Sequence, residues 1–345
     1  FGQPPETTHT VPADRLVLGG TLMHTTRGRA RSAGLIVLTL LLALWAVFPA
    51  FAAPGGNGNG NGRGDGELPP GLADRSELPP GLADRGIDLP PGLLRGTTTV
   101  TFLHHNDGES QLLVGDDGIG GVAEFATLVD ELRDDAPTGD GDSGVFLISA
   151  GDNFLAGPEL NASFATDFMP FYDVLALEEI GYDALVIGNH EFDFGPDVLE
   201  TFIRSFGDAP PILSANLDFS GEPGFDDLTD ANGPIAASTI LTTSDGTEIG
   251  LVGATTETLP SVSSPRNVDV GDVATAVQDE IDDLMDEGVG IIVLASHLQG
   301  LNTDQELLKK LSGVDIAIAG GGDELLANPG DVLAPGDTPE GPYPT

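Results

Sequence analysis

Carboxylate, carboxamide and imidazole side chains recur at one kind of position in this sequence, directly after short apolar runs. The run TTTVTFL at residues 97–103 is followed by HHNDGESQLL, which contains Asp107 and Glu109. Divalent cations that assist phosphoryl chemistry use such groups when several loops bring them together. The pattern therefore predicts a metal centre. Later apolar runs are followed in the same way by Asp152, Asn189, His190, Asp193, Asn216, His297, Asp323 and Glu324.

Each of these residues also has an ordinary structural interpretation. A single Asp after a strand is commonly a turn residue or a helix cap, and a single His is commonly a hydrogen-bonded surface residue. Only one residue separates Asp107 from Glu109, so on an extended chain both side chains point to the same side and can contact one cation. The alternative is an acidic turn without a metal. Recurrence after six apolar runs favours the metal centre.

From residue 97 onward, short apolar runs alternate with amphipathic stretches. This alternation predicts an α/β or layered αββα domain, in which the loops at the carboxyl ends of the strands carry the site. Two β runs around Asp245-Gly246, within 238–256, predict a hairpin. The other expected strands are 97–103, 144–150, 183–188, 211–217, 290–296 and 314–320, and the expected helices are 120–135, 166–181, 196–207, 272–288 and 303–313.

Several segments, in their order, resemble a known family. The chain is similar to secreted 5′-nucleotidases of the calcineurin-like metallophosphoesterase superfamily in FLHHNDGESQL, ISAGDNFLAG, VIGNHEFDFG, ILSANL and ASHLQGLNTDQELLKKLSGVDIAIAGGG. The resemblance covers about residues 98–330, and GNHEFD is its most specific element. It implies a four-layer αββα sandwich. It also implies a phosphoesterase that hydrolyses nucleotides or other small phosphate esters by attack of a metal-bound hydroxide.

The resemblance implies two divalent cations at the strand ends. Asp107 would hold the first cation, Asp152 would bridge both, and Asn189 and His297 would hold the second. The cations would make the site attractive to a phosphate group that the rest of this acidic protein repels.

The resemblance gives the remaining polar residues of GNHEFD a catalytic role. His190 would stabilise or protonate the leaving group, and Asp193 would orient the imidazole of His190. A second class of function stays open, in which the protein is a non-catalytic surface scaffold that binds Ca²⁺ or a protein partner.

Two motifs expected from that family are altered. The third position of Asp-x-His is Glu109, and the two ligand positions of Gly-His-x-His fall on Gly321 and Asp323. Glu324 would replace Asp323 if the loop were one residue longer. One interpretation is an oxygen-rich centre, with Glu109 and Asp323 as ligands, that favours Mn²⁺, Mg²⁺ or Ca²⁺ over Zn²⁺. The other is a centre that has lost one or both cations, the second first, because Gly321 offers no ligand.

The first hundred residues differ in composition from the rest. Three arginines, an apolar stretch from Leu35 to Phe48 and small residues before Ala53 predict a signal peptide cleaved near Ala52/Ala53, and hence a secreted or cell-surface protein. An uncleaved anchor is the alternative. Residues 1–53 are thus expected to consist of an upstream extension, before Met23, and the signal peptide. Residues 54–96 predict a disordered linker in which a Gly/Asn tract precedes repeats of ELPPGLADR. The repeats would serve either as a spacer or as a docking motif for a cell-surface partner. The expected metallophosphoesterase domain spans 97–330, and 331–345 would begin a linker to a C-terminal domain.

Acidic side chains outnumber basic ones by 55 to 13, and the net charge is −42. Nucleic-acid polymers and anionic lipid surfaces are excluded as partners on this ground, because both need cationic groups on the protein. The apolar stretch is short for a membrane span of roughly 20 residues, so no stable membrane insertion is expected. The charge is typical of a hydrated surface in a salty habitat. Because cysteine is absent, the chain has neither a disulfide framework nor a thiolate site.

Overall fold

The larger of the two main sheets is built on parallel strands. In the computed structural model, which describes residues 21–22, 34–42, 98–115, 118, 120–136, 143–322, 324–331, 333 and 336–345, its strands follow the order β1-β2-β3-β4-β5-β6-β8. Strands β3 to β8 of this sheet are parallel, whereas β2 pairs antiparallel with β3, and β1 with β2. The bounds are β1 Thr21–Leu22, β2 Gly34–Leu42, β3 Thr98–Asn106, β4 Ser143–Ser149, β5 Ala184–Val186, β6 Ile212–Leu213 and β8 Ile235–Ala236.

The second sheet has the order β13-β12-β10-β9. Its first two pairings are parallel, and β9 and β10 form the antiparallel hairpin that Asp245-Gly246 predicted. Strands β7 and β11 pair only with each other and form a separate two-stranded ribbon among the described strands. The bounds are β7 Leu217–Asp218, β9 Ser238–Thr242, β10 Glu248–Thr255, β11 Asp269–Val270, β12 Ile292–His297 and β13 Ile316–Gly320.

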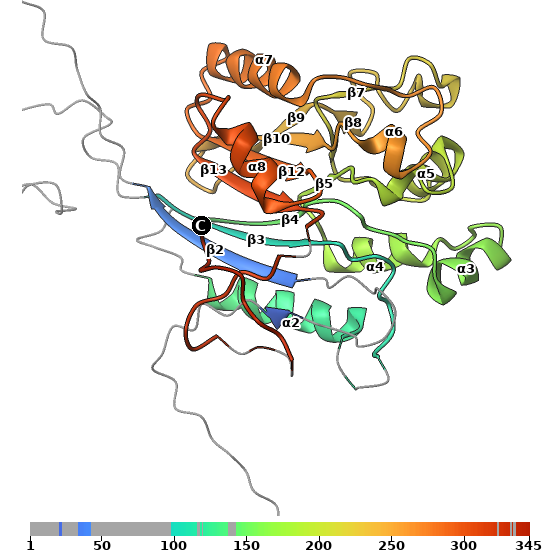
Figure 1. Ribbon diagram of the computed structural model, residues 1–345, viewed down its shortest axis with the longest axis horizontal. Helices are drawn as coiled ribbons and strands as arrows, with labels where there is room; N and C mark the ends of the chain where they lie inside the picture. The colour runs from blue at the N-terminus through green and yellow to red at the C-terminus, as the bar shows by residue number, and fades with distance from the viewer. Residues whose placement is uncertain are drawn as a thin grey trace, which may run out of the picture.

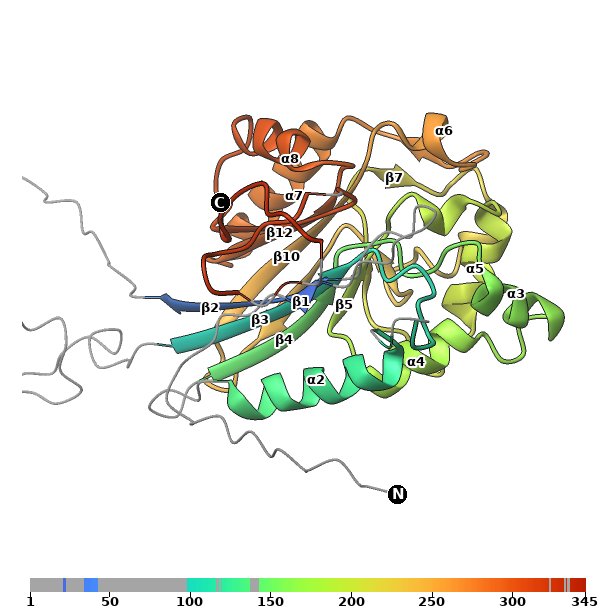
Figure 2. The same cartoon turned by 60° about the horizontal axis from the view of Figure 1, so that its bottom comes forward.

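Helices cover the outer face of each sheet, which gives four layers (Figure 1). Helices α7 and α8 lie on the second sheet, and α2 and α4 lie on the opposite side of the molecule, against the first sheet (Figure 2). The chain is therefore a mixed α/β fold, as the alternation of strands and helices predicted. The bounds are α2 Val122–Asp135, α3 Pro158–Ala165, α4 Tyr172–Ile180, α5 Pro196–Arg204, α6 Leu259–Val262, α7 Val273–Asp286 and α8 Leu301–Leu308, with short 3₁₀ turns η2 His190–Phe192 and η3 Pro223–Phe225.

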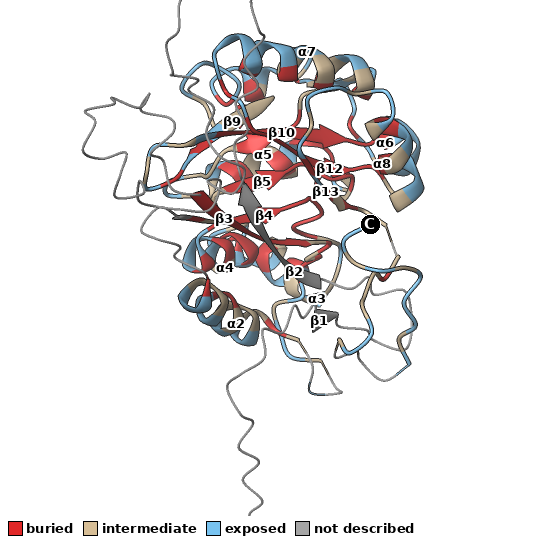
Figure 3. Cartoon of the chain, turned by 90° about the vertical axis from the view of Figure 1, so that its left-hand side faces the viewer, coloured by how far each residue is buried: buried red, intermediate tan, exposed pale blue. Residues whose placement is uncertain are grey.

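The layers are held by three apolar clusters. One lies between the two sheets and contains Phe102, Ile148 and Val293, each at most 1% exposed. The second joins the first sheet to α2 through α5, and the third joins the second sheet to α7 and α8. Figure 3 shows the buried residues concentrated in the strands and on the inner faces of the helices. Truncating one such side chain to Ala typically costs about 2–5 kcal/mol, so these clusters hold the two sheets and the helices together.

The helix expected at 166–181 is shorter than predicted, and a further helix precedes it. Helix α4 begins at Tyr172, because Asp167 and Phe168 have φ angles of 50° and 55°, which interrupt a right-handed helix. The hydroxyl of Ser163 accepts the N–H of Tyr172 at 3.0 Å and so joins α3 to α4. The signal for α3 was Pro158 at its first turn, after Gly157.

Strand β2 comes from the apolar stretch that was expected to be a signal peptide. It pairs with β3 from Gly34 opposite Asn106 to Leu42 opposite Thr98. The remaining residues of 1–53, apart from β1, and the linker at 54–96 with its repeats lie outside the described residues. No helix in the described ranges is long and apolar enough to span a membrane.

The C-terminal segment folds back onto the first sheet. The hydroxyl of Tyr343 lies 3.4 Å from Nε2 of His104 on β3, and the carboxamide of Asn328 donates to the carbonyl of Tyr343. The N–H of Ala327 donates to the carbonyl of Gly341 at 2.9 Å. Residues 336–345 therefore pack against the domain, and their role as the start of a linker stays a prediction.

Candidate metal centre

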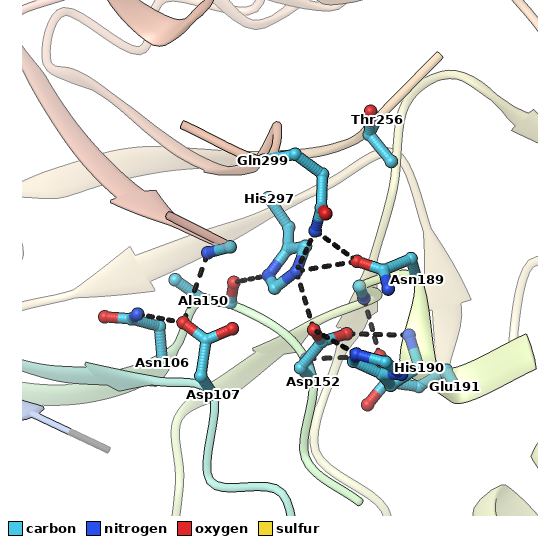
Figure 4. A network of polar contacts seen from close by, with 12 residues as sticks. Asn106, Asp107, Ala150, Asp152, Asn189, His190, Glu191, Thr256, His297 and Gln299 are labelled. Atoms are coloured by element: carbon cyan, nitrogen blue, oxygen red, sulfur yellow. Dashed lines mark hydrogen bonds and ion pairs between the residues drawn. The ribbon is translucent and has the colours of Figure 1, made fainter. Parts of the chain in front are cut away.

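The candidate residues lie at the carboxyl ends of parallel strands: Asp107, Asp152 and Asn189 follow β3, β4 and β5, and His297 is the last residue of β12. Strands β3 and β4 of the first sheet end beside β12 and β13 of the second, where His297 contacts Ala150 at 2.8 Å and Gly321 contacts Asp107 at 3.2 Å. Figure 4 shows Asp107, Asp152, Asn189, His190 and His297 directed toward a common centre. Asp107 and Asp152 meet because β3 and β4 are parallel neighbours that present the same ends at one edge of the first sheet. His297 reaches them from β12 of the second sheet, where its Nδ1 contacts the carbonyl of Ala150.

The loop after β3 does not continue as an extended chain. The φ angles of Asp107, Glu109 and Ser110 are 54°, 48° and 58°, a left-handed region that non-glycine residues seldom adopt. The N–H of Asp107 donates to the carbonyl of Gly151 at 3.0 Å, and that of Glu109 to the carbonyl of Asp152 at 2.9 Å. Because the chain turns here, the alternation of an extended strand does not apply. Asp107 and Glu109 fall into different groups, in contrast to the expected single shared cation.

The first group, here called the His297 group, consists of Asp107, Asp152 and His297. One ligand atom from each lies within 4.8 Å of the others, and each residue is at most 2% exposed. Nδ1 of His297 donates to the carbonyl of Ala150 at 2.8 Å, so Nε2 faces Oδ2 of Asp152 at 3.0 Å. Burial opposes protonation of this imidazole, but the two carboxylates raise the pKa of His297 to about 10. The group therefore attracts positive charge.

The second group, here called the His190 group, consists of Glu109, Asp152 and His190, again with one ligand atom each within 4.8 Å. Nδ1 of His190 donates to Oδ2 of Asp193 at 2.7 Å, and Nε2 lies 3.8 Å from Oδ2 of Asp152. The hydroxyl of Ser263 donates to the other oxygen of Asp193 at 2.9 Å. Burial lowers the pKa of His190, but the bond to Asp193 and the charge of Asp152 outweigh it and raise the pKa.

Asn189 connects the two groups. Its Oδ1 lies 3.2 Å from Nε2 of His297 and accepts a hydrogen bond from the carboxamide of Gln299. The next residue, His190, donates its backbone N–H to Oδ1 of Asp152 at 2.8 Å. The resemblance assigned Asp107 and His297 to different cations, whereas the structure brings both into the His297 group, with Asn189 beside them.

The position of the missing histidine faces this centre. A β-carbon on Gly321 would lie 2.7 Å from Nε2 of His297, and the N–H of Gly321 donates to Oδ2 of Asp107 at 3.2 Å. A side chain at 321 would therefore begin inside the His297 group. As the sequence indicated, Gly321 contributes no ligand there.

Asp323 lies outside the described residues. The carboxylate of Glu324 is directed elsewhere, because a β-carbon on Gly322 or Gly300 would meet its oxygens at 2.2 Å and 3.5 Å. Its charge also contributes to the raised pKa of Asp304, behind the stronger effect of burial. Within the described ranges, Glu324 belongs to neither group of candidate ligands.

The residues present fit divalent cations. Oδ1 of Asp107 is buried and has no hydrogen-bond partner among the described residues. Most of the candidate ligand atoms are carboxylate or amide oxygens, and the two imidazoles are those of His190 and His297. A buried carboxylate oxygen without a donor is costly, and a cation satisfies it. Oxygen donors of this kind suit hard divalent cations.

Glu191 is a residue of the site to which the sequence analysis gave no role. It is 1% exposed, and its carboxylate accepts the backbone N–H groups of Gly188 at 2.7 Å, Asp152 at 3.2 Å and Asn153 at 2.6 Å. Burial and the neighbouring charge of Asp152 raise the pKa of Glu191 to about 7. Its place in GNHEFD was the available signal. Glu191 fixes the loop that carries Asp152 against the loop that carries His190.

An open apolar groove lies elsewhere on the surface, on the helix layer of the first sheet. Its volume is about 710 Å³, and none of the candidate ligands lines it. An apolar lining does not bind phosphate or a divalent cation, so the groove does not compete with the strand-end centre as the chemical site. The lining residues are Leu112, Leu113, Val122, Ala123, Ala126, Pro158, Glu159, Ala162, Tyr172, Leu175, Ala176, Glu179 and Ile180.

Comparisons with known proteins agree with this architecture. Residues 103–322 match the sequence profile of calcineurin-like phosphoesterases. The chain is 33% identical to the 5′-nucleotidase of Diplobatis ommata, over 71% of this chain and 41% of that protein. It is 30% identical to a trifunctional nucleotide phosphoesterase protein of Bacillus subtilis, over 65% of this chain and 16% of that protein.

A solved structure is also similar. The 5′-nucleotidase precursor of Thermus thermophilus superimposes with a TM-score of 0.58 at 28% sequence identity, covering 71% of this chain and 45% of that chain. The present chain thus spans less than half the length of these three proteins.

Proposed function

Because the chain belongs to the calcineurin-like phosphoesterase family, we propose that it hydrolyses phosphate esters at the strand-end centre. The observation that supports this most directly is the His297 group. Asp107, Asp152 and His297 come from three strand ends, yet their ligand atoms lie within 4.8 Å of one another in a buried site. Residues that served only as turn residues or surface histidines would not be expected to gather in one buried cluster.

In this proposal two divalent cations are held by the two groups. Asp107 and His297, with Asn189, would hold one cation, and Glu109 would hold the other. Asp152, which belongs to both groups, would contribute to both, while His190 would stay free of metal. When bound, the cations neutralise the charge of the phosphate group and lower the pKa of a water molecule. The oxygen-rich donor set favours Mn²⁺, Mg²⁺ or Ca²⁺ over Zn²⁺. Asp323 remains a proposed further ligand.

His190 is the proposed proton donor to the leaving group. Its Nδ1 is held by Asp193 at 2.7 Å, which directs Nε2 toward the carboxylates of the His190 group. Against the opposing effect of burial, the pKa of His190 is raised by the bond to Asp193 and the charge of Asp152, which favours the protonated imidazolium. An imidazolium in this position binds an anionic phosphate ester and gives up its proton as the ester oxygen departs.

The proposed substrate class is small phosphate esters, with nucleotides as the first candidates. The names of the similar proteins support this choice, since they describe 5′-nucleotidases and a nucleotide phosphoesterase. A net charge of −42 repels anions at a distance, so substrate binding depends on cations and on the imidazolium at the centre.

We also propose that the protein is exported, from the order of basic, apolar and small residues before Ala53. Cleavage near Ala52 removes residues 34–42, so a cleaved molecule lacks strand β2 and has β3 at the sheet edge. N-terminal sequencing of the mature protein tests this. A sequence beginning at Ala53 is expected, and one that begins upstream of residue 34 contradicts cleavage.

The activity is tested with the full chain and its His190→Ala variant. Phosphate release from p-nitrophenyl phosphate and AMP is measured with Mn²⁺, Mg²⁺, Ca²⁺ and Zn²⁺, and bound metal is measured on the same samples. The variant is expected to lose about 10²–10⁴-fold in kcat, the usual range for a general acid, and to retain its metal. Glu306→Gln, an exposed change on α8, serves as the matched control.

Two results would contradict the proposal. Equal turnover of wild type and His190→Ala would exclude His190 as the proton donor. Stoichiometric metal binding without turnover of any ester would favour the non-catalytic scaffold.

A further inference from the structure

The side chain of Gln299 contacts two of the candidate ligands, Asn189 and His297. Gln299 lies two residues after His297, and its carboxamide donates to Oδ1 of Asn189. The same amide nitrogen lies 3.4 Å from Nε2 of His297. Figure 4 shows the side chain directed into the space between these two residues.

The backbone at this residue is held in an unusual conformation. The φ angle of Gln299 is 68°, in the left-handed region, and Gly300 follows with a φ of 151°. A glutamine in this region costs of order 1–3 kcal/mol, and such residues persist where the surroundings impose them, most often at functional sites. The turn directs the glutamine side chain back toward Asn189 instead of letting it enter solvent.

Gly321, at the altered ligand position, lies directly beside it. A β-carbon on Gly321 would lie 3.1 Å from the backbone nitrogen of Gln299 and 2.7 Å from Nε2 of His297. A side chain at 321 and the loop of Gln299 would therefore compete for the same space. Because residue 321 is a glycine, space is left for the loop of Gln299, and the carboxamide of Gln299 approaches the position where a side chain at 321 would begin.

We propose that Gln299 is a metal ligand of the His297 group and that its carboxamide oxygen takes the place of the imidazole that Gly321 lacks. This inference rests on the proposed function, because it presupposes the two-cation centre. It adds a ligand from a residue that neither of the altered motifs contains.

The chemistry of the carboxamide permits this role. Oxygen and nitrogen are attached to the same carbon, and a half-turn about the last side-chain bond exchanges their positions. With the nitrogen inward, Gln299 donates to Oδ1 of Asn189; with the oxygen inward, it offers a lone pair at the same point. Asn189, Gln299 and His297 then present three lone pairs next to the Asp152 carboxylate. Carbonyl oxygens suit Ca²⁺, Mg²⁺ and Mn²⁺ better than Zn²⁺.

The test is Mn²⁺ binding to the full chain, measured by calorimetric titration and by metal content after dialysis, independently of turnover. Wild type is compared with Gln299→Ala and Gln299→Glu. The matched control is Gln278→Ala, which also removes a hydrogen-bonded carboxamide, one that donates to Asp282 on α7 at 2.8 Å.

Wild type and Gln278→Ala are expected to bind two Mn²⁺. Gln299→Ala should weaken one of the two by at least about tenfold, since even residues that only support a ligand contribute 10–100-fold. Gln299→Glu keeps an oxygen donor and should retain both cations, which also guards against a failure of the alanine variant to fold.

Two outcomes overturn the inference and differ in what else they affect. If Gln299→Ala binds both cations as tightly as wild type, or if folded Gln299→Glu loses the same cation as Gln299→Ala, Gln299 is not a ligand and the proposed function stands. If wild type itself binds fewer than two cations, the two-cation centre fails, and with it the inference.

Discussion

The buried carboxyl group of Asp173 should make this protein less stable as the pH rises. Asp173, in the first turn of α4, is 2% exposed. Burial raises its pKa from 3.8 to about 6, against the smaller opposing effect of the nearby Ser110 side chain. The folded state thus binds this proton more tightly than the unfolded chain does. The contribution of Asp173 to the free energy of unfolding should fall as the pH rises from about 4 to about 6 and should then stay level.

The size of the effect follows from the pKa values of Asp173. A rise from 3.8 to about 6 corresponds to roughly 3 kcal/mol, because one pKa unit is about 1.4 kcal/mol. Asp173→Asn keeps the shape and removes the charge, so it should stabilise the protein by up to roughly 3 kcal/mol at pH 7.5 and by almost nothing at pH 4. For a domain of this size, about 3 kcal/mol corresponds to a rise in Tm of roughly 6–12 °C.

The assay is thermal and urea unfolding of the full chain at both pH values. Asp208→Asn is the control, because Asp208 is exposed and its substitution removes one negative charge from the same highly acidic protein without changing burial. Asp173→Asn should exceed this control at pH 7.5 and match it at pH 4. Equal gains for the two variants at pH 7.5, or a gain for Asp173→Asn that persists at pH 4, would refute the reasoning.

Three further predictions concern the site and the surface. Glu191→Gln places an amide against three backbone N–H donors and should cost about 1–3 kcal/mol in urea unfolding and weaken Mn²⁺ binding in calorimetry; unchanged values in both would contradict its role in fixing the loops. Ser263→Ala removes the hydrogen bond to Asp193 and should lower kcat for phosphate release several-fold with bound Mn²⁺ unchanged, whereas Ser263→Thr should retain kcat; equal losses in both variants would argue against the hydroxyl. Raising KCl from 0.1 M to 1 M shortens the Debye length from about 10 Å to about 3 Å and should raise the Tm of this chain of net charge −42, measured by scanning calorimetry; a lower Tm would show that self-repulsion is not the dominant surface effect.

The meeting of distant residues could be predicted because it follows from strand direction. Asp107 and Asp152 follow the parallel neighbours β3 and β4, which present their carboxyl ends together. His297 ends β12 of the second sheet, so its approach also depends on how the two sheets pack. The directions of the side chains could not be predicted. They depend on left-handed φ angles at Asp107 and Glu109, which no periodicity reveals and which separate two residues that an extended chain would direct to one side.

Gln299 and Glu191 illustrate two further limits of the sequence. Gln299 lies in a loop without an apolar period, and only the turn at that residue brings its carboxamide to Asn189. Glu191 is visible within a motif, but its function depends on three backbone donors, one from its own loop after β5 and two from the loop after β4. The expected helix at 166–181 failed for a related reason, because Asp167 and Phe168 adopt φ angles that their residue types rarely adopt.

The buried carboxylates favour an oxygen-rich centre over one that has lost its cations. Asp107, Glu109, Asp152 and Glu191 are each at most 4% exposed, and the first three belong to the two ligand groups that share Asp152. Burying a carboxylate costs several kcal/mol unless positive charge or several donors compensate. Glu191 is compensated by backbone N–H groups, whereas the two imidazoles of the centre cannot fully balance the other three carboxylates. A centre without cations would be relieved of this cost by any neutral substitution at these positions. Three buried carboxylates in one cluster therefore favour bound cations.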